Sequence, residues 1–121
     1  MSKRILVVED QEDNRRIVRD LLTTVGYEVI EAVTGEEGVK MAGAHTPDLI
    51  LMDIQLPGLD GYEATRRIKA IPALCQIPVI AVTSYALSGD DVKAFEAGCD
   101  AYVSKPFSPR ALLAKIREFV P

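Results

Sequence analysis

The run Leu49-Ile50-Leu51-Met52 (residues 49–52) decides the predicted fold, because four apolar residues follow one another without a polar interruption. Two further runs have the same form, Ile5-Leu6-Val7-Val8 and Val79-Ile80-Ala81-Val82. A strand covered on only one face alternates between apolar and polar residues, so these three runs predict central strands of a parallel sheet. Tyr27-Glu28-Val29-Ile30 alternates in part and suits an edge strand, and Ala101-Tyr102-Val103 suits a short fifth strand.

Segments with helical signals separate the five predicted strands. The first helix has an apolar face made by Ile17, Val18, Leu21, Leu22 and Val25, with Gly26 after it, and the second opens with the capping box Thr34-Gly35-Glu36-Glu37. The third carries Tyr62, Ile68 and Ile71 after the turn Pro57-Gly58, and the fourth starts at Ser88-Gly89-Asp90-Asp91 and is closed by Gly98. The last starts at Ser108-Pro109 and continues with Leu112, Leu113, Ile116 and Phe119. This alternation predicts right-handed βαβ units with helices on both faces of the sheet. The predicted fold class is α/β, a doubly wound, flavodoxin-like parallel sheet of order 2-1-3-4-5, with residues 1–121 as one domain.

Length and composition exclude several classes of function. The 121 residues carry a formal net charge of −4, which argues against direct binding to nucleic acid. Cys75, Cys99 and the single histidine, His45, form neither a C-x-x-C pair nor a zinc-type cluster. No apolar run is long enough for a signal peptide or a membrane span, so we expect a cytoplasmic protein with no membrane contact.

Polar side chains follow the predicted strands at the edge of the sheet where ligands bind in this class of fold. The first run ends in Glu9-Asp10, the second in Asp53, the third in Thr83-Ser84 and the short fifth strand in Ser104-Lys105-Pro106. Taken singly, Glu9, Asp10 and Lys105 are better explained as solvated surface groups. Their placement directly after buried runs favours one shared site.

Three carboxylates at one strand end need compensating charge. Two unit charges about 4 Å apart repel by roughly 4 kcal/mol at an effective dielectric constant near 20. Lys105 supplies one positive charge, and a divalent cation would supply the rest. Carboxylate oxygens without thiolate or imidazole neighbours favour Mg²⁺, with Mn²⁺ as a substitute, over zinc.

Together these motifs resemble the receiver domains of two-component response regulators, over essentially the whole chain. The matching residues are Val8-Glu9-Asp10, the stretch Asp53-Ile54-Gln55-Leu56-Pro57-Gly58-Leu59-Asp60-Gly61, Thr83 and Lys105-Pro106. Residues 86–90 and 98–106 look like stand-alone receivers of the chemotaxis and cell-cycle types, and like those linked to hybrid histidine kinases.

The resemblance implies a role for each residue of the site. Asp53 would be the phosphorylated nucleophile, and Asp10 and Asp53 would bind Mg²⁺ directly. Gln55 would contribute its backbone carbonyl to the metal, and Glu9 would act through water. Lys105 would pair with the phosphoryl oxygens.

It also implies a conformational switch. Thr83 would hydrogen-bond the phosphoryl group, and Tyr102 would move into the space that Thr83 leaves, which changes the face made by the fourth helix, fifth strand and fifth helix. A half-buried Tyr102 that only packs is the alternative. Gln55 and Tyr85 would tune the phosphoryl lifetime, and the peptide between Lys105 and Pro106 would be cis.

The implied partners are a histidine kinase or histidine phosphotransfer protein as phosphoryl donor, and a downstream protein that the sequence does not identify. The sequence leaves a weak homodimer through the fourth and fifth helices open.

Two rival classes fit only parts of the pattern. A flavodoxin-like redox protein needs a Ser/Thr/Gly-rich phosphate loop after the first strand, where this chain has the acidic residues 9–13. A magnesium-dependent phosphohydrolase needs a second acid two residues after its nucleophile, where this chain has Gln55. We therefore expect a phosphoacceptor signalling domain, not an enzyme, that promotes only its own phosphorylation and dephosphorylation.

Overall fold

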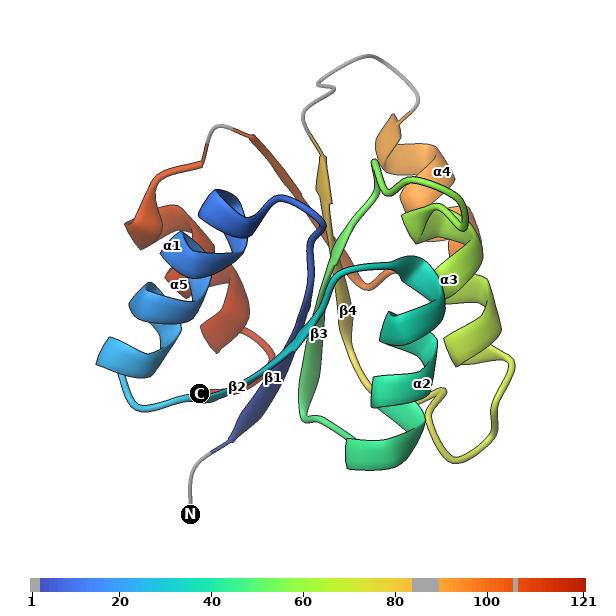
Figure 1. The fold of residues 1–121 in the computed structure, drawn as a ribbon, viewed down its shortest axis with the longest axis horizontal. Coiled ribbons are helices and arrows are strands. Elements are labelled where there is room, and N and C mark those ends of the chain that lie inside the picture. The colour runs from blue at the N-terminus through green and yellow to red at the C-terminus, as the bar shows by residue number, and fades with distance from the viewer. Residues whose placement is uncertain (1–2, 84–89, 106) are drawn as a thin grey trace.

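Five parallel strands form one sheet in the order β2-β1-β3-β4-β5, which confirms the predicted topology (Figure 1). The computed structural model describes residues 3–83, 90–105 and 107–121. The strands are β1 (Arg4–Val8), β2 (Glu28–Ala32), β3 (Leu49–Asp53), β4 (Val79–Thr83) and β5 (Ala101–Ser104). The helices are α1 (Glu12–Thr24), α2 (Gly35–His45), α3 (Gly61–Lys69), α4 (Asp90–Ala97) and α5 (Pro109–Arg117).

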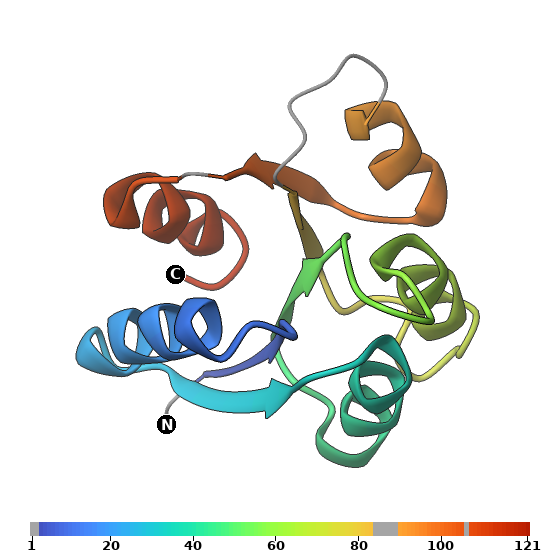
Figure 2. The same cartoon turned by 45° about the horizontal axis from the view of Figure 1, so that its top comes forward.

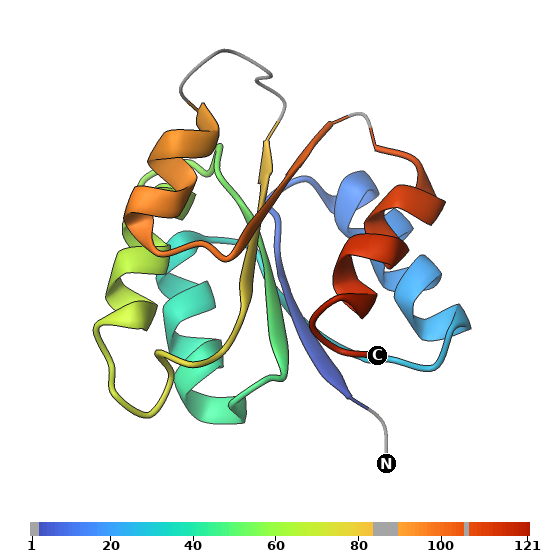
Figure 3. The ribbon, with the colours of Figure 1, turned by 180° about the vertical axis from the view of Figure 1, so that it is seen from behind.

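Helices cover both faces of the sheet, and two apolar cores result. Helices α1 and α5 lie on one side, and α2, α3 and α4 lie on the other (Figures 2 and 3). Alternate residues of β1 enter different cores: Ile5 and Val7 pack on the α1 and α5 side, whereas Leu6 and Val8 pack on the other. The apolar runs show no alternation because each face of a central strand is buried.

The helix ends follow the predicted capping signals. Thr34 accepts a hydrogen bond from the Glu37 backbone N–H at 3.0 Å, and Ser108 accepts one from Ala111 at 3.0 Å. Gly26 has a φ of 98°, and its N–H donates to the Thr23 carbonyl. This left-handed geometry ends α1 and favours glycine. The predicted start of α4 at Ser88-Gly89 lies outside the described residues.

Several predicted boundaries differ from the structure. Strand β2 begins at Glu28 rather than Tyr27, because the Tyr27 N–H donates to the Leu22 carbonyl and completes the end of α1. Helix α3 ends at Lys69, so Ile71 lies beyond it. Ile71 precedes Pro72, and a residue before proline disfavours helical geometry. Phe119 likewise lies beyond α5, although it packs against the core.

The predicted apolar face of α1 is buried only in part. Val18 and Leu22 are buried, but Ile17 and Val25 are 58% and 38% exposed. Val25 lies just past the end of the helix. Helical periodicity identifies the apolar side of a helix, but the part of that side that touches the sheet depends on how the helix is docked.

None of the helices among the described residues combines the length and the apolar character that crossing a membrane requires.

The two cysteines have different surroundings, and we expect their reactivity to differ. Both thiols are free, and only Cys99 is buried. Burial raises the pKa of Cys99 from 9.0 to about 11, and the hydrogen bond with Thr65 acts in the opposite direction. At about pH 8 only about one Cys99 thiol in a thousand is then ionised, and the thiolate is the reactive form.

A chromogenic disulfide reagent should therefore titrate one thiol per folded chain quickly and the second only after denaturation. The pKa of Cys99 is higher in the folded protein than in the unfolded protein. The contribution of the Cys99 thiol to stability is therefore complete below pH 9 and is lost as the pH rises towards about 11. A Cys99→Ser variant that retains the fast reaction assigns it to Cys75. Two equally fast thiols in the folded protein would contradict the burial of Cys99.

Candidate functional site

The register of the sheet brings the polar strand ends to one level. Val8 pairs with Met52 and Ala32, and Asp53 pairs with Val82. Thr83 pairs with Ser104, so Lys105 follows at the same edge. The prediction that these strand ends share one edge of the sheet is confirmed by this register.

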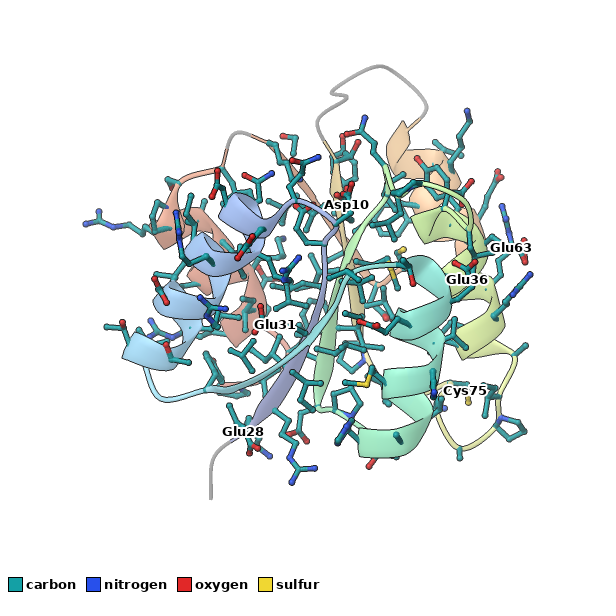
Figure 4. The ribbon with its side chains drawn as sticks, viewed as in Figure 1. Asp10, Glu28, Glu31, Glu36, Glu63 and Cys75 are labelled. Atoms are coloured by element: carbon teal, nitrogen blue, oxygen red, sulfur yellow. The ribbon has the colours of Figure 1, made fainter. Side chains whose placement is uncertain are left out.

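Three carboxylates form a cluster at this edge. Oxygens of Glu9, Asp10 and Asp53 all lie within 4.8 Å of one another. Glu9 and Asp53 are each 5% exposed, and Asp10 is half-buried. Figure 4 shows Asp10 at the end of the sheet where β1 stops. A group of oxygen ligands with this spacing fits a hard divalent cation such as Mg²⁺.

Lys105 joins the cluster from the other side of β3. Its Nζ lies 2.8 Å from Glu9 Oε1 and 3.6 Å from Asp53 Oδ2. The lysine offsets one of the three negative charges, and the remaining charge favours a cation at the same place.

Backbone contacts hold the side chain of Asp53. The Gln55 N–H donates to Asp53 Oδ1 at 3.0 Å, and the Ile54 N–H donates to the Val82 carbonyl at 3.0 Å. With Oδ1 held in this way, Oδ2 stays on the side of Lys105. The Gln55 carbonyl as a metal ligand stays a prediction.

The residues predicted to form the switch are close to the site in the sheet. Thr83 is fully buried at the end of β4, and Tyr102 is half-buried on β5, where it pairs with Ala81 and packs against the core on the α4 side. Their movement stays a prediction. Tyr85 and Pro106 lie outside the described residues, so the lifetime role of Tyr85 and the cis peptide stay predictions too.

An open cavity of about 490 Å³ lies over Asp53, between α1 and the start of α5. Glu9, Asp53 and Lys105 line its polar part. Its apolar part is lined mainly by Val7, Val18, Leu51, Val82, Phe107 and Leu112. Ile17 also lines the cavity, which accounts for its exposure. The sequence did not predict this groove, because the apolar pattern puts Ile17 on one helical face with Val18 and Leu22 and does not show which part of that face contacts the sheet.

Similarity to known proteins identifies the family to which this chain belongs. Residues 5–117 match the sequence model of the response regulator receiver domain. The chain belongs to the response regulator receiver domains. The receiver is 44% identical to the polar-differentiation response regulator DivK of Brucella ovis over 120 residues, which cover 99% of this chain and 98% of that relative.

Solved structures agree with this assignment. The receiver is 37% identical to the receiver domain of the sensor histidine kinase PA1611 from Pseudomonas aeruginosa PAO1, with a TM-score of 0.92 over 99% of this chain and 98% of that one. That structure holds a magnesium ion coordinated in its active site cleft. Chemotaxis protein CheY4 of Vibrio cholerae, 24% identical, has the same fold, with a TM-score of 0.93 over 98% of this chain and 99% of that one.

Membership of this family makes the receiver a two-component response regulator and a signalling domain. Receivers of this kind partner with histidine kinases or phosphotransfer proteins, and they bind Mg²⁺ at an acidic cluster. The cluster of Glu9, Asp10 and Asp53 is the corresponding group of oxygens in this chain.

Proposed function

We propose that the receiver accepts a phosphoryl group on Asp53 in a magnesium-dependent reaction, with a phosphohistidine of a histidine kinase or phosphotransfer protein as donor. One observation carries this proposal. Asp53 lies in the carboxylate cluster, its Oδ1 is held by a backbone N–H, and its Oδ2 is 3.6 Å from Lys105 at an open cavity.

The chemistry follows from this arrangement. A carboxylate oxygen of Asp53 attacks the phosphorus in line, the P–N bond of the donor breaks, and the imidazole leaves with the bonding electron pair. Lys105, now paired with Glu9, offers its ammonium to the phosphoryl oxygens. Positioning and charge neutralisation supply most of the catalysis in reactions of this type.

The metal site completes the charge balance. We propose that Asp10 and Asp53 bind Mg²⁺ directly, with the Gln55 carbonyl as a further ligand and Glu9 acting through water. Mn²⁺ should replace Mg²⁺, since both prefer oxygen ligands. The ion neutralises charge on the phosphoryl oxygens when it is bound.

The proposed output is a change of the face formed by α4, β5 and α5. Phosphoryl oxygens at Asp53 give Thr83 a new acceptor, and Tyr102 responds from the neighbouring strand. Val92 and Phe95 support a binding role for this face, because these apolar side chains of α4 are 53% and 52% exposed. Full switching from 1:99 to 99:1 requires about 5.5 kcal/mol, so we expect a partial shift that a partner completes.

In this proposal residues 1–121 act as one domain, and this domain catalyses only its own phosphorylation and dephosphorylation. Gln55 and Tyr85 tune the lifetime of the phosphoryl group. The cytoplasmic location stays a prediction from the sequence, which leaves a weak homodimer open and does not identify the downstream partner.

Intact-protein mass spectrometry tests the proposal. The protein is incubated with a small acyl-phosphate donor, with Mg²⁺ or with a chelator, next to an unrelated receiver as a positive control. We expect a gain of one phosphoryl group per chain that requires the metal. No gain in a folded sample, when the control receiver is phosphorylated in the same mixture, would contradict it.

A further inference from the structure

Arg15 contacts the backbone of the metal site from outside the carboxylate cluster. It lies on α1, and its side chain is only 15% exposed. Its Nη1 donates to the backbone carbonyl of Glu9 at 3.0 Å. This carbonyl belongs to the peptide that joins Glu9 to Asp10, so Arg15 holds the link between two of the three clustered acids.

A second contact fixes the guanidinium group. Arg15 Nε donates to Glu31 Oε1 at 3.0 Å, and Arg19 Nη1 lies 3.2 Å from the same oxygen. Glu31 belongs to β2 and lies on the α1 side of the sheet, where Figure 4 labels it. Because a guanidinium is a planar fork, the bond from Nε to Glu31 aims Nη1 at the Glu9 carbonyl.

Other contacts hold Glu9 at different atoms. Its N–H donates to the Ala32 carbonyl at 3.0 Å, and its carboxylate accepts from the Gln11 N–H at 3.2 Å and from Lys105 at 2.8 Å. Arg15 acts on the carbonyl, which sets the plane of the following peptide. The direction of the Asp10 Cα–Cβ bond depends on that plane.

We propose that Arg15, aimed by Glu31, is a positioning residue for magnesium, because it fixes the Glu9–Asp10 peptide and thereby directs Asp10 into the cluster. This inference rests on the proposed metal site. It concerns a residue that touches neither the metal nor the phosphoryl group. Residues that orient metal ligands in this way typically change metal affinity by about 10-fold to 100-fold when they are replaced.

The direction of the change in Mg²⁺ affinity distinguishes a positioning role of Arg15 from an effect of its charge. A cation near the cluster repels Mg²⁺, so loss of the Arg15 charge alone would tighten metal binding. Loss of a positioning contact weakens metal binding instead. We therefore expect Arg15→Met to weaken Mg²⁺ binding by about 10-fold, against the electrostatic expectation.

Arg16→Met is the matched control. Arg16 is the next residue on α1, its side chain is 57% exposed, and it pairs with Asp13, which is 84% exposed. The control removes the same charge from the same helix without touching Glu9, so we expect wild-type affinity or slightly tighter binding. Arg15→Lys and Glu31→Gln serve as milder variants, and both should weaken binding less than Arg15→Met.

The measurement is isothermal titration of metal-free protein with MgCl₂ at constant ionic strength, with a thermal melt of each variant without metal. The rate of phosphoryl uptake is then measured against Mg²⁺ concentration. A positioning role raises the Mg²⁺ concentration for half-maximal rate and leaves the rate at saturating metal near wild type. General damage to the fold lowers the saturated rate instead.

The outcomes distinguish this inference from the proposed function. Wild-type protein that binds Mg²⁺, together with an Arg15→Met variant of equal or higher affinity, overturns the positioning role alone. If Arg15→Met does not fold, wild-type affinity in both Arg15→Lys and Glu31→Gln overturns it. Wild-type protein that binds no Mg²⁺ overturns the proposed metal site and the positioning role together.

Discussion

The Asp53→Asn variant should gain no phosphoryl group from any donor that phosphorylates the wild-type protein. An uncharged amide replaces the carboxylate nucleophile, and one oxygen ligand of the acidic cluster loses its charge. Both changes remove interactions that the transfer step needs. Intact mass after incubation with Mg²⁺ and an acyl phosphate measures the result.

The same change should not harm the fold in the absence of metal. Asp53 is 5% exposed and lies among two further carboxylates, so removal of its charge relieves repulsion between buried groups. Lys105 keeps its contact with Glu9 at 2.8 Å. We expect a melting temperature without metal that equals or exceeds that of the wild type, which makes the loss of phosphorylation a loss of chemistry.

Asp13→Asn is the control for Asp53→Asn. Asp13 follows the cluster on α1, its side chain is 84% exposed, and its pair with Arg16 is a surface contact. This variant carries the same chemical change and should be phosphorylated like the wild type. A phosphorylated Asp53→Asn protein would place the acceptor elsewhere, and peptide mapping would then locate it.

Gly61→Ala should destabilise the protein by about 3 kcal/mol, because its new methyl group has no space. A Cβ at Gly61 would collide with the carbonyl oxygen of Asp53 and would lie 2.7 Å from Ile54 Cα. These are backbone atoms, so they cannot rotate away as a side chain would. Either the start of α3 or the peptide after Asp53 must move, and phosphorylation should therefore slow as well.

Gly43→Ala provides the comparison within a helix. Gly43 is an exposed residue of α2, and a Cβ added there meets nothing within 4 Å. Alanine favours the helix over glycine by up to about 1 kcal/mol, so this variant should be slightly more stable than the wild type. Urea unfolding followed by circular dichroism gives both free energies. Equal stability of the two variants would contradict the close approach at Gly61.

Much of the candidate site could be predicted because it depends on topology. Asp53 and Lys105 are far apart in the sequence, yet each follows a strand of a parallel sheet. The carboxyl ends of such strands meet at one edge, whatever the packing of the helices. The structure confirms the expected cluster of Glu9, Asp10 and Asp53, and places Lys105 beside it.

The contacts of the helices could not be predicted in the same way. Ile17 carries the periodicity of a core residue but lines an open cavity. In the sequence Gly61 is only the last residue of the motif that begins at Asp53, whereas in the structure the backbone of Asp53 leaves no space for a Cβ at Gly61. Both outcomes depend on how far a helix lies from the sheet, which the apolar pattern of the helix does not encode.

The parallel sheet and its acidic edge follow from the sequence alone, because burial of both strand faces leaves unbroken apolar runs and the alternation of strands with helices makes the strands parallel. The contact of Arg15 with the Glu9 carbonyl, and the bond from Arg15 to Glu31 that holds it there, arise only in the folded protein. The sequence does not specify these partners because an arginine side chain is long and can reach in many directions. An arginine can bond many acceptors, and the docking of α1 against β2 selects the one that it meets.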